Sequence, residues 1–280
     1  MYIIDPRKKV GVSCPFNSTI SESITPYLGQ IPCLQLCFNG YNDGYNNDGP
    51  ILSNLLAKPT STVERIYLHS SVRTNISNTA ENSRTVVPPS IKHVNSALIY
   101  TTHIPASVIL HYGSRGTTSK TIDSLYQCHI PTNAKLDYPL LLENSAGQGT
   151  ELGSQVDEIR KVFEKVHLSR IGMCLDTCHA FAAGYQVDKP ALLQQLLDEL
   201  DNIAPKRLKM VHLNDSVQPC NSRIDRHANI RSGHIWRNDD SSLQYLLEYG
   251  AENHIDFILE TPSAIDDLLN LRASYLASRQ

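Results

Sequence analysis

Eight short β-rich segments, separated by stretches with helical periodicity, constrain the fold of this 280-residue chain more than any other feature. Each segment is largely apolar, as is usual for strands that are covered on both faces of a parallel sheet. Their residue ranges are 9–13, 34–38, 65–69, 106–111, 139–143, 171–176, 209–213 and 256–260. Alternating β and α units in a chain of this length predict an α/β fold, a TIM (β/α)8 barrel formed as a single domain over residues 1–280.

Helical patterns lie between the strand segments. Apolar residues recur at three-and-four spacing from Val156 to Val166, and leucines line one face of the segment that Pro190 opens. Both patterns predict crossover helices of a barrel. A further leucine-rich helix is predicted to end at Gly250, because glycine often terminates helices. The weakest signal lies between the fourth and fifth strand segments, where only a short helix around Leu125 is indicated.

Composition gives expectations about the cellular context. No stretch approaches the roughly twenty apolar residues of a membrane span, and the first residues, MYIIDPRKK, lack the pattern of a secretory leader. The seven cysteines include no close CxxC pair, which favours reduced thiols. We therefore expect an intracellular, non-secreted monomer without a membrane partner, and leave open whether its location is cytoplasmic, nuclear or viral.

Metal-binding residue types stand at or near the C-terminal end of six successive strand segments. In a barrel these ends converge on one rim, where the active sites of this fold are built. One such residue is more often structural than catalytic, but six in succession, all His, Asp or Glu, favour a metal cluster at the C-terminal rim. The six residues are His69, His111, Glu143, Asp176, His212 and Glu260.

Two nearby motifs add further candidates. His179 follows Asp176 by three residues, although the pair alone fits a capping carboxylate and a core histidine equally well. In the stretch NSRIDRH, Asp225 and His227 are two residues apart, so both side chains project to the same side of an extended backbone and suit one ion. Arg226 lies between them, and a surface salt bridge explains it as well as a phosphate contact does.

These motifs resemble those of the endonuclease IV family, the zinc-dependent apurinic/apyrimidinic endonucleases of base excision repair. The match is specific because the motifs occur in the order and with the spacing of that family. They are LLENSAGQGTELG at 141–153, IGMCLDTCHAFAAGY at 171–185, VHLNDS at 211–216, SRIDRH at 222–227 and ILETP at 258–262, with weaker likeness in YLHSS at 67–71 and LHYGS at 110–114.

The resemblance implies a three-zinc cluster, with manganese as an alternative at one site. The first zinc would be held by His69, His111 and Glu143, the second by Asp176, His212, Glu260 and the same bridging Glu143, and the third by His179, Asp225 and His227. The implied reaction hydrolyses the phosphodiester bond 5′ to an abasic site in duplex DNA through a metal-bridging hydroxide and leaves a 3′-hydroxyl. Glu143, Glu260 and Asp176 would be the catalytic residues of this hydrolase.

The net charge of −3 argues at first against a DNA partner, but three bound divalent ions would bring the formal charge to +3. Two other functions are considered. A divalent-metal sugar isomerase or epimerase shares the barrel and its strand-end ligands, but has no use for the loop with Asp225, Arg226 and His227. A DNA-binding module without activity would be expected to lack a ligand, and none is missing.

The sequence departs from the family where DNA is gripped. Family members commonly have a basic and aromatic loop after the second strand, whereas residues 39–49 here read NGYNDGYNNDG. This segment is a loop by composition and fits a plain surface connection as well as a binding element. The candidate DNA contacts are Tyr41, Tyr45, Val72, Tyr112 and Arg226, and Val72 stands where a tyrosine is common in the family.

Overall fold

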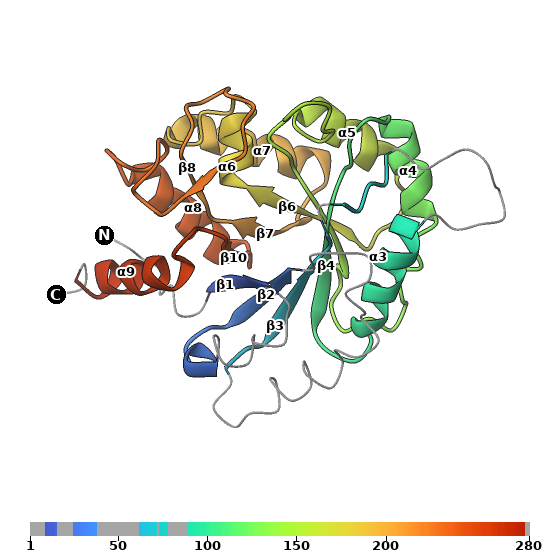
Figure 1. Ribbon diagram of the computed structural model, residues 1–280, viewed down its shortest axis with the longest axis horizontal. Coiled ribbons are helices and arrows are strands. Elements are labelled where there is room, and N and C mark those ends of the chain that lie inside the picture. The colour runs from blue at the N-terminus through green and yellow to red at the C-terminus, as the bar shows by residue number, and fades with distance from the viewer. Residues whose placement is uncertain (1–8, 16–24, 38–61, 72, 78–88, 278–280) are drawn as a thin grey trace.

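The predicted strand segments pair into one closed barrel of parallel strands (Figure 1). The computed structural model describes residues 9–15, 25–37, 62–71, 73–77 and 89–277. Around the barrel the strands follow the order β1-β10-β7-β6-β5-β4-β3-β2, and every neighbouring pair is parallel. Their bounds are β1 Val10–Pro15, β2 Cys33–Cys37, β3 Arg65–His69, β4 Ala106–His111, β5 Leu140–Glu143, β6 Ile171–Asp176, β7 Leu208–His212 and β10 Asp256–Leu259. The predicted barrel is confirmed, and β3, β4 and β6 have the predicted limits.

Helices lie around the outside of the barrel (Figure 1). Their bounds are α3 Pro89–Tyr100, α4 Thr118–Tyr126, α5 Val156–Lys165, α6 Thr177–Ala182, α7 Pro190–Ile203, α8 Ser241–Glu252 and α9 Ala264–Ala277, with a 3-10 turn η2 at Thr25–Tyr27. The leucine face predicted after Pro190 is buried in α7, and the weakly indicated helix is α4. Two short strands, β8 Asp215–Ser216 and β9 His227–Ala228, form a separate antiparallel pair.

Gly250 does not end its helix, contrary to the prediction. Helix α8 continues to Glu252, with Asn253 as its C-cap. A Cβ atom at Gly250 would lie 2.3 Å from the ring of Phe257 on β10, closer than packed atoms approach. The glycine is therefore explained by the close packing of α8 on the barrel strand, and not by a turn.

The barrel interior is filled by an apolar layer that supports the rim. Side chains alternate across a strand, so a residue two positions after an inward-facing residue also faces inward, one layer nearer the C-terminal rim. The apolar layer consists of Cys33, Tyr67, Ile109, Leu141, Cys174, Met210 and Ile258. Two positions further along the chain stand Gln35, His69, His111, Glu143, Asp176, His212 and Glu260. Strand periodicity thus places six predicted ligands, together with one glutamine, in the layer above the apolar core.

A charged network closes the opposite end of the barrel. Asp256 is 2% exposed and accepts hydrogen bonds from Arg65 Nη2 at 2.9 Å and from the Tyr67 hydroxyl at 2.8 Å. Lys9 lies 3.6 Å from the same carboxylate. These contacts join β1, β3 and β10 at their N-terminal ends.

Among the described residues, no helix has the length and apolar character that crossing a bilayer requires.

Candidate metal centre

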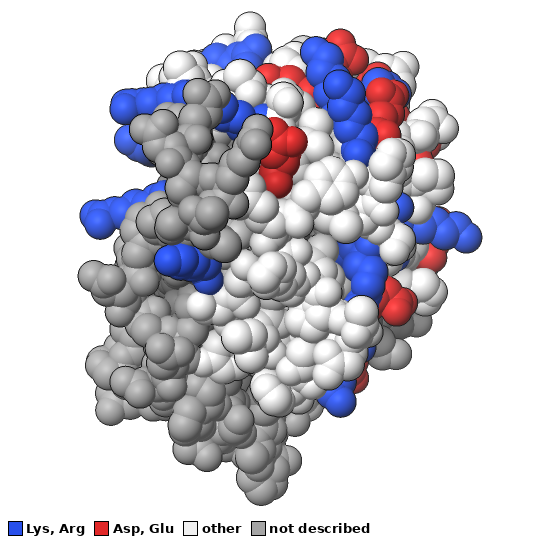
Figure 2. Space-filling view, turned by 90° about the vertical axis from the view of Figure 1, so that its right-hand side faces the viewer, with Lys and Arg blue, Asp and Glu red and all other residues white. Residues whose placement is uncertain are grey.

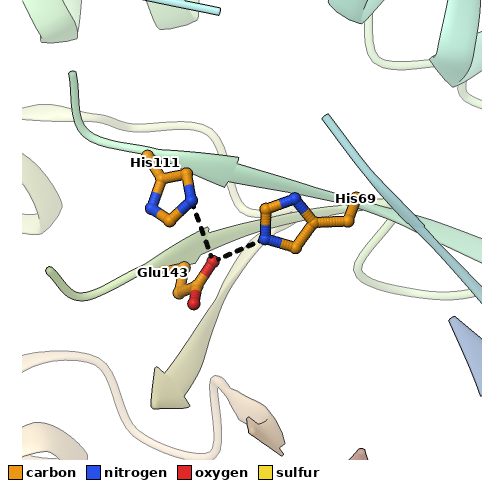
Figure 3. Close-up of side chains that lie close together, drawn as sticks. All are labelled: His69, His111 and Glu143. Carbon is orange, nitrogen blue, oxygen red and sulfur yellow. Dashed lines mark hydrogen bonds and ion pairs between the residues drawn. The ribbon is translucent and has the colours of Figure 1, made fainter. Parts of the chain in front are cut away.

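The first group of candidate ligands comes from the neighbouring strands β3, β4 and β5 (Figure 3). Glu143 Oε2 lies 3.0 Å from His69 Nε2 and 3.5 Å from His111 Nε2. The register brings this about, because His111 pairs directly with Glu143 in the ladder. His69 Nδ1 lies 2.8 Å from the Ser70 carbonyl oxygen, which can only accept a hydrogen bond. That contact directs the Nε2 lone pair of His69 toward the site.

The second group forms on the other oxygen of the same carboxylate. Glu143 Oε1 lies 2.8 Å from His212 Nδ1. His212 Nδ1 is also 3.3 Å from Glu260 Oε2 and 3.8 Å from Asp176 Oδ2. Glu143 is fully buried, and its two oxygens face two different sets of residues. This is the arrangement that a carboxylate bridging two metal ions needs.

The third group joins the two motifs that lie outside the strand ends. His179 Nε2 lies 3.3 Å from Asp225 Oδ2, and His227 Nε2 lies 3.2 Å from Asp225 Oδ1. Asp225 Oδ1 and His227 Nε2 are both buried, yet neither makes a hydrogen bond within the described part of the chain. Buried polar atoms normally have a partner, so two that face one another without a hydrogen bond fit a cation held between them.

Asp176 both caps a helix and faces the cluster. Its Oδ1 accepts a hydrogen bond from the backbone N–H of His179 at 2.8 Å, which caps α6. Its Oδ2 accepts from Asn214 Nδ2 at 2.7 Å and lies 3.7 Å from His227 Nε2. The capping interpretation is therefore confirmed for Oδ1, while Oδ2 remains available to a metal ion as predicted.

Two asparagines that the sequence interpretation did not single out contact several of the candidate ligands. Asn144 Oδ1 accepts a hydrogen bond from the Asp176 backbone N–H at 2.6 Å. The backbone carbonyl oxygen of Asn144 lies 2.9 Å from His179 Nδ1. Asn214 bridges Asp176 and Glu260, because its Oδ1 accepts from the Glu260 N–H at 3.0 Å. Both asparagines lie in the quoted motifs just beyond strand ends. Their position was the available signal for this role.

Charges and protons are shared within the cluster. Burial alone would raise the pKa of Glu143, but the surrounding histidines, led by His111 and His212, hold it well below its usual range. Burial alone would lower the pKa of His69, but Glu143 raises it to about 9. Burial lowers the pKa of His111 to about 4. A divalent ion would bind through the same nitrogen and oxygen lone pairs that hold these protons, so its binding would release them.

A cavity leads to the cluster from the rim. It has a volume of about 130 Å³, and among its lining residues are His111, His179 and Asp225 together with Ser114 and Glu151. A single water needs only about 10–15 Å³ of such volume, so the cavity has room for several water-sized groups. The ligand groups are thus reachable from outside the barrel.

The predicted DNA contacts fare differently from the ligands. Tyr112 is only 2% exposed, and its ring packs so closely on Gly153 that a Cβ atom there would lie 2.3 Å away. The burial contradicts its predicted role as a DNA contact. Arg226 is exposed, and its guanidinium donates to the Asp225 carbonyl oxygen at 2.8 Å. Tyr41, Tyr45 and Val72 lie outside the described residues.

Surface charge on one side of the molecule is mixed. Figure 2 shows the side that carries α3 and α4 in Figure 1, with Lys and Arg side chains in separate groups, some of them beside Asp and Glu. Much of the middle of that face is uncharged. The described part of this face therefore has no continuous basic surface of the kind that holds a polyanion.

Known proteins resemble this chain in sequence. Residues 57–275 match the family model described as xylose isomerase-like TIM barrel. A probable endonuclease 4 of Chlorobium phaeovibrioides is 40% identical over 126 residues, which cover 44% of this chain and 44% of the relative. An apurinic-apyrimidinic endonuclease 1 of Plasmodium falciparum is 38% identical over 147 residues, which cover 52% of this chain and 24% of the relative. The chain thus spans less than half the length of these curated relatives.

A solved structure resembles the whole fold. Endonuclease IV from Thermus thermophilus superposes with a TM-score of 0.76 and 24% sequence identity. The superposition covers 96% of this chain and 99% of that one. It shows that the two chains share the barrel fold.

Proposed function

We propose a function from the premise that the chain belongs to the xylose isomerase-like TIM barrel family. Within that family, we propose that it is an apurinic/apyrimidinic endonuclease of DNA repair. It would hydrolyse the phosphodiester bond 5′ to an abasic site in duplex DNA and leave a 3′-hydroxyl. The observation that carries this proposal is the placement of Glu143, whose Oε2 faces His69 and His111 and whose Oε1 faces His212.

The donor set fits zinc. Nine side chains, all His, Asp or Glu, provide nitrogen and carboxylate oxygen ligands, the types that zinc binds, and we propose three zinc ions with manganese as an alternative at one site. When bound, such ions supply positive charge to phosphate oxygens and lower the pKa of an attacking water to about 7. The nine residues are His69, His111, Glu143, Asp176, His179, His212, Asp225, His227 and Glu260.

The residues of the chain would divide the work between them. Glu143 joins the first two groups and fixes their separation, because one rigid carboxylate contacts both. Asp176, anchored through its other oxygen to the start of α6, keeps its position relative to His212 and His227. The cavity beside His111, His179 and Asp225 would receive the phosphate. No protein nucleophile is needed, because water attacks.

A sugar isomerase or epimerase is the alternative within this family of barrels. Its chemistry needs one or two ions and a small polar pocket. Here Asp225 and His227 complete a third group with His179, beyond the two groups that share Glu143. The third group supports phosphodiester hydrolysis over sugar isomerisation.

The test uses the purified chain and an end-labelled duplex with one synthetic abasic site. We expect incision 5′ to the site, loss of incision after chelation, and recovery when zinc is restored. The matched duplex without the lesion should stay intact. Aldose–ketose interconversion measured on the same preparation provides the other arm. Metal-dependent sugar conversion without incision would replace this proposal with the alternative.

A further inference from the structure

Gln35 occupies a position in the barrel that belongs to the metal centre. It stands two residues after Cys33 of the apolar interior layer, as His69 stands two after Tyr67 and His212 two after Met210. Its side chain is fully buried. Six other strand ends contribute a candidate ligand to this layer, whereas β2 contributes the amide of Gln35.

The Gln35 amide contacts two ligands of the same predicted ion. Gln35 Nε2 donates to Glu260 Oε1 at 2.6 Å, and Gln35 Oε1 lies 2.8 Å from His212 Nε2. A weaker contact joins Gln35 Nε2 to Ser13 Oγ at 3.2 Å. These contacts link β1, β2 and the residue that directly follows β10 to His212 on β7.

The contacts fix the orientation of the amide. An ionised carboxylate only accepts hydrogen bonds, so the amide must present its NH2 group to Glu260. The carbonyl oxygen of Gln35 is then the atom that faces His212. Reversing the amide would place this oxygen against the carboxylate oxygen of Glu260, and two acceptors would repel each other.

The orientation of the amide determines which nitrogen of His212 carries the proton. Gln35 Oε1 can only accept, so His212 Nε2 must be the protonated nitrogen. In the neutral imidazole that binds a metal ion, His212 Nδ1 then carries the lone pair, and it is the atom that faces Glu143 Oε1 at 2.8 Å. Two hydrogen bonds thus connect the Glu260 carboxylate, the Gln35 amide and the His212 imidazole, which are far apart in sequence.

We propose that Gln35 is a positioning residue of the metal centre, which holds Glu260 and selects the His212 tautomer that presents Nδ1 to the second ion. The proposal rests on the metal centre of the proposed function but not on the identity of the substrate. Residues that orient metal ligands in this way usually contribute a factor of about 10–100 to metal affinity. We expect an effect of that size here.

The experiment compares Gln35→Leu and Gln35→Met with Ser13→Ala. Leucine and methionine keep apolar bulk at the position but remove both amide contacts. Ser13→Ala is the matched control, because it removes a neighbour of the amide and leaves the contacts to Glu260 and His212. Each zinc-loaded protein is titrated with a competing chelator of known affinity, and the zinc remaining per chain is measured. Thermal unfolding verifies that each variant is folded.

We expect both Gln35 variants to release one zinc at about 10- to 100-fold lower chelator strength than the wild type, while Ser13→Ala behaves as the wild type does. In ¹⁵N-histidine NMR of the zinc-loaded wild type, His212 should show a protonated Nε2 and a metal-bound Nδ1, and the Gln35 variants should lose this signature. Unchanged zinc release with an unchanged His212 signature in both folded variants would overturn the proposal. Equal zinc loss from Ser13→Ala would also overturn it, since a loosened strand would then explain the effect.

The two proposals fail separately. A wild-type chain that binds zinc but does not incise abasic DNA removes the proposed function, while the chelator titration and the His212 spectrum still decide the role of Gln35. If incision is observed, the Gln35 variants should lose kcat at limiting zinc and keep the KM for DNA. Excess zinc should then restore much of the lost kcat.

Discussion

The backbone N–H of His179 donates a hydrogen bond to Asp176 Oδ1 at 2.8 Å, although the two side chains face different ligand groups. The bond starts helix α6 directly at the end of β6. This abrupt turn directs the His179 ring toward Asp225, while Asp176 Oδ2 faces His212 and His227. The turn thus separates the two side chains, and their assignment to two different metal ions stays a prediction.

Substituting Glu260→Gln should reduce incision at abasic sites by about a hundredfold or more. The change keeps the shape of the side chain but removes the negative charge that faces His212 Nδ1 at 3.3 Å. Binding of abasic duplex should persist, because the cavity proposed to receive the phosphate is lined by other residues. Single-turnover incision rates and equilibrium binding separate the two effects. Glu164→Gln, an exposed position on α5, serves as the control, and unaltered incision by Glu260→Gln would remove Glu260 from the site.

Purified protein should contain about three tightly held zinc or manganese ions per chain, because nine ligands form three groups. Removing them should lower thermal stability, since Glu143, Asp176 and Glu260 then lose the cations that separate their charges. Each ion present at about a thousand times its dissociation constant would contribute about 4 kcal/mol to the free energy of unfolding. Elemental analysis and thermal unfolding with and without chelator measure both effects. A content of one ion or fewer would contradict the assignment.

Because Asp267 is buried, its carboxyl group should make the free energy of unfolding decrease as the pH rises. Burial raises the pKa of Asp267, and the hydrogen bonds from Thr261 Oγ1 at 2.6 Å and the Ile230 N–H at 3.1 Å offset this only in part. A carboxyl with a raised folded-state pKa stabilises the fold most below its unfolded pKa of about 3.9, and this contribution is lost as the pH rises through the folded pKa.

The variant Asp267→Asn mimics the protonated acid at all pH values and keeps an acceptor for Thr261 and Ile230. Its stability relative to the wild type should therefore increase as the pH rises above about 3.9 and level off above the folded-state pKa of Asp267. Urea unfolding of both proteins across that range gives the difference directly. A difference that decreases as pH rises would show that the ionised carboxylate is the favoured form.

The double substitution Tyr41→Ala and Tyr45→Ala should weaken binding of abasic duplex by at least about tenfold, or 1.4 kcal/mol. An enzyme that extrudes a nucleotide must fill the vacated stack, and aromatic stacking contributes roughly 1 to 3 kcal/mol per base. Residues 39–49 follow β2 in the sequence, and the C-terminal end of β2 lies on the rim with the candidate ligands. Fluorescence anisotropy measures affinity, and zinc content should be unchanged. Equal affinity before and after the change would assign the grip on the lesion to other loops.

The sequence by itself determined the barrel and the convergence of most candidate ligands on one rim. A strand has a side-chain period of two, and parallel strands of a barrel end at one rim, so strand-end residues such as His69, His111 and Glu143 had to converge. The weak signal before β5 still gave a helix, because Leu125 and Ile122 mark a buried face. These inferences needed only local periodicity and the closure of the barrel.

Only the tertiary structure decided how individual atoms meet. The predictions for Gly250 and Tyr112 were wrong because the groups that pack on them lie in other elements. Gly250 packs on the ring of Phe257, and the ring of Tyr112 packs on Gly153. Gln35 looked unremarkable in sequence, yet it contacts His212 across a separation of 177 residues. The periodicity of a strand fixes which side chains point inward, whereas the register and stagger of the closed barrel fix which inward atoms come within hydrogen-bonding distance, and that depends on all eight strands at once.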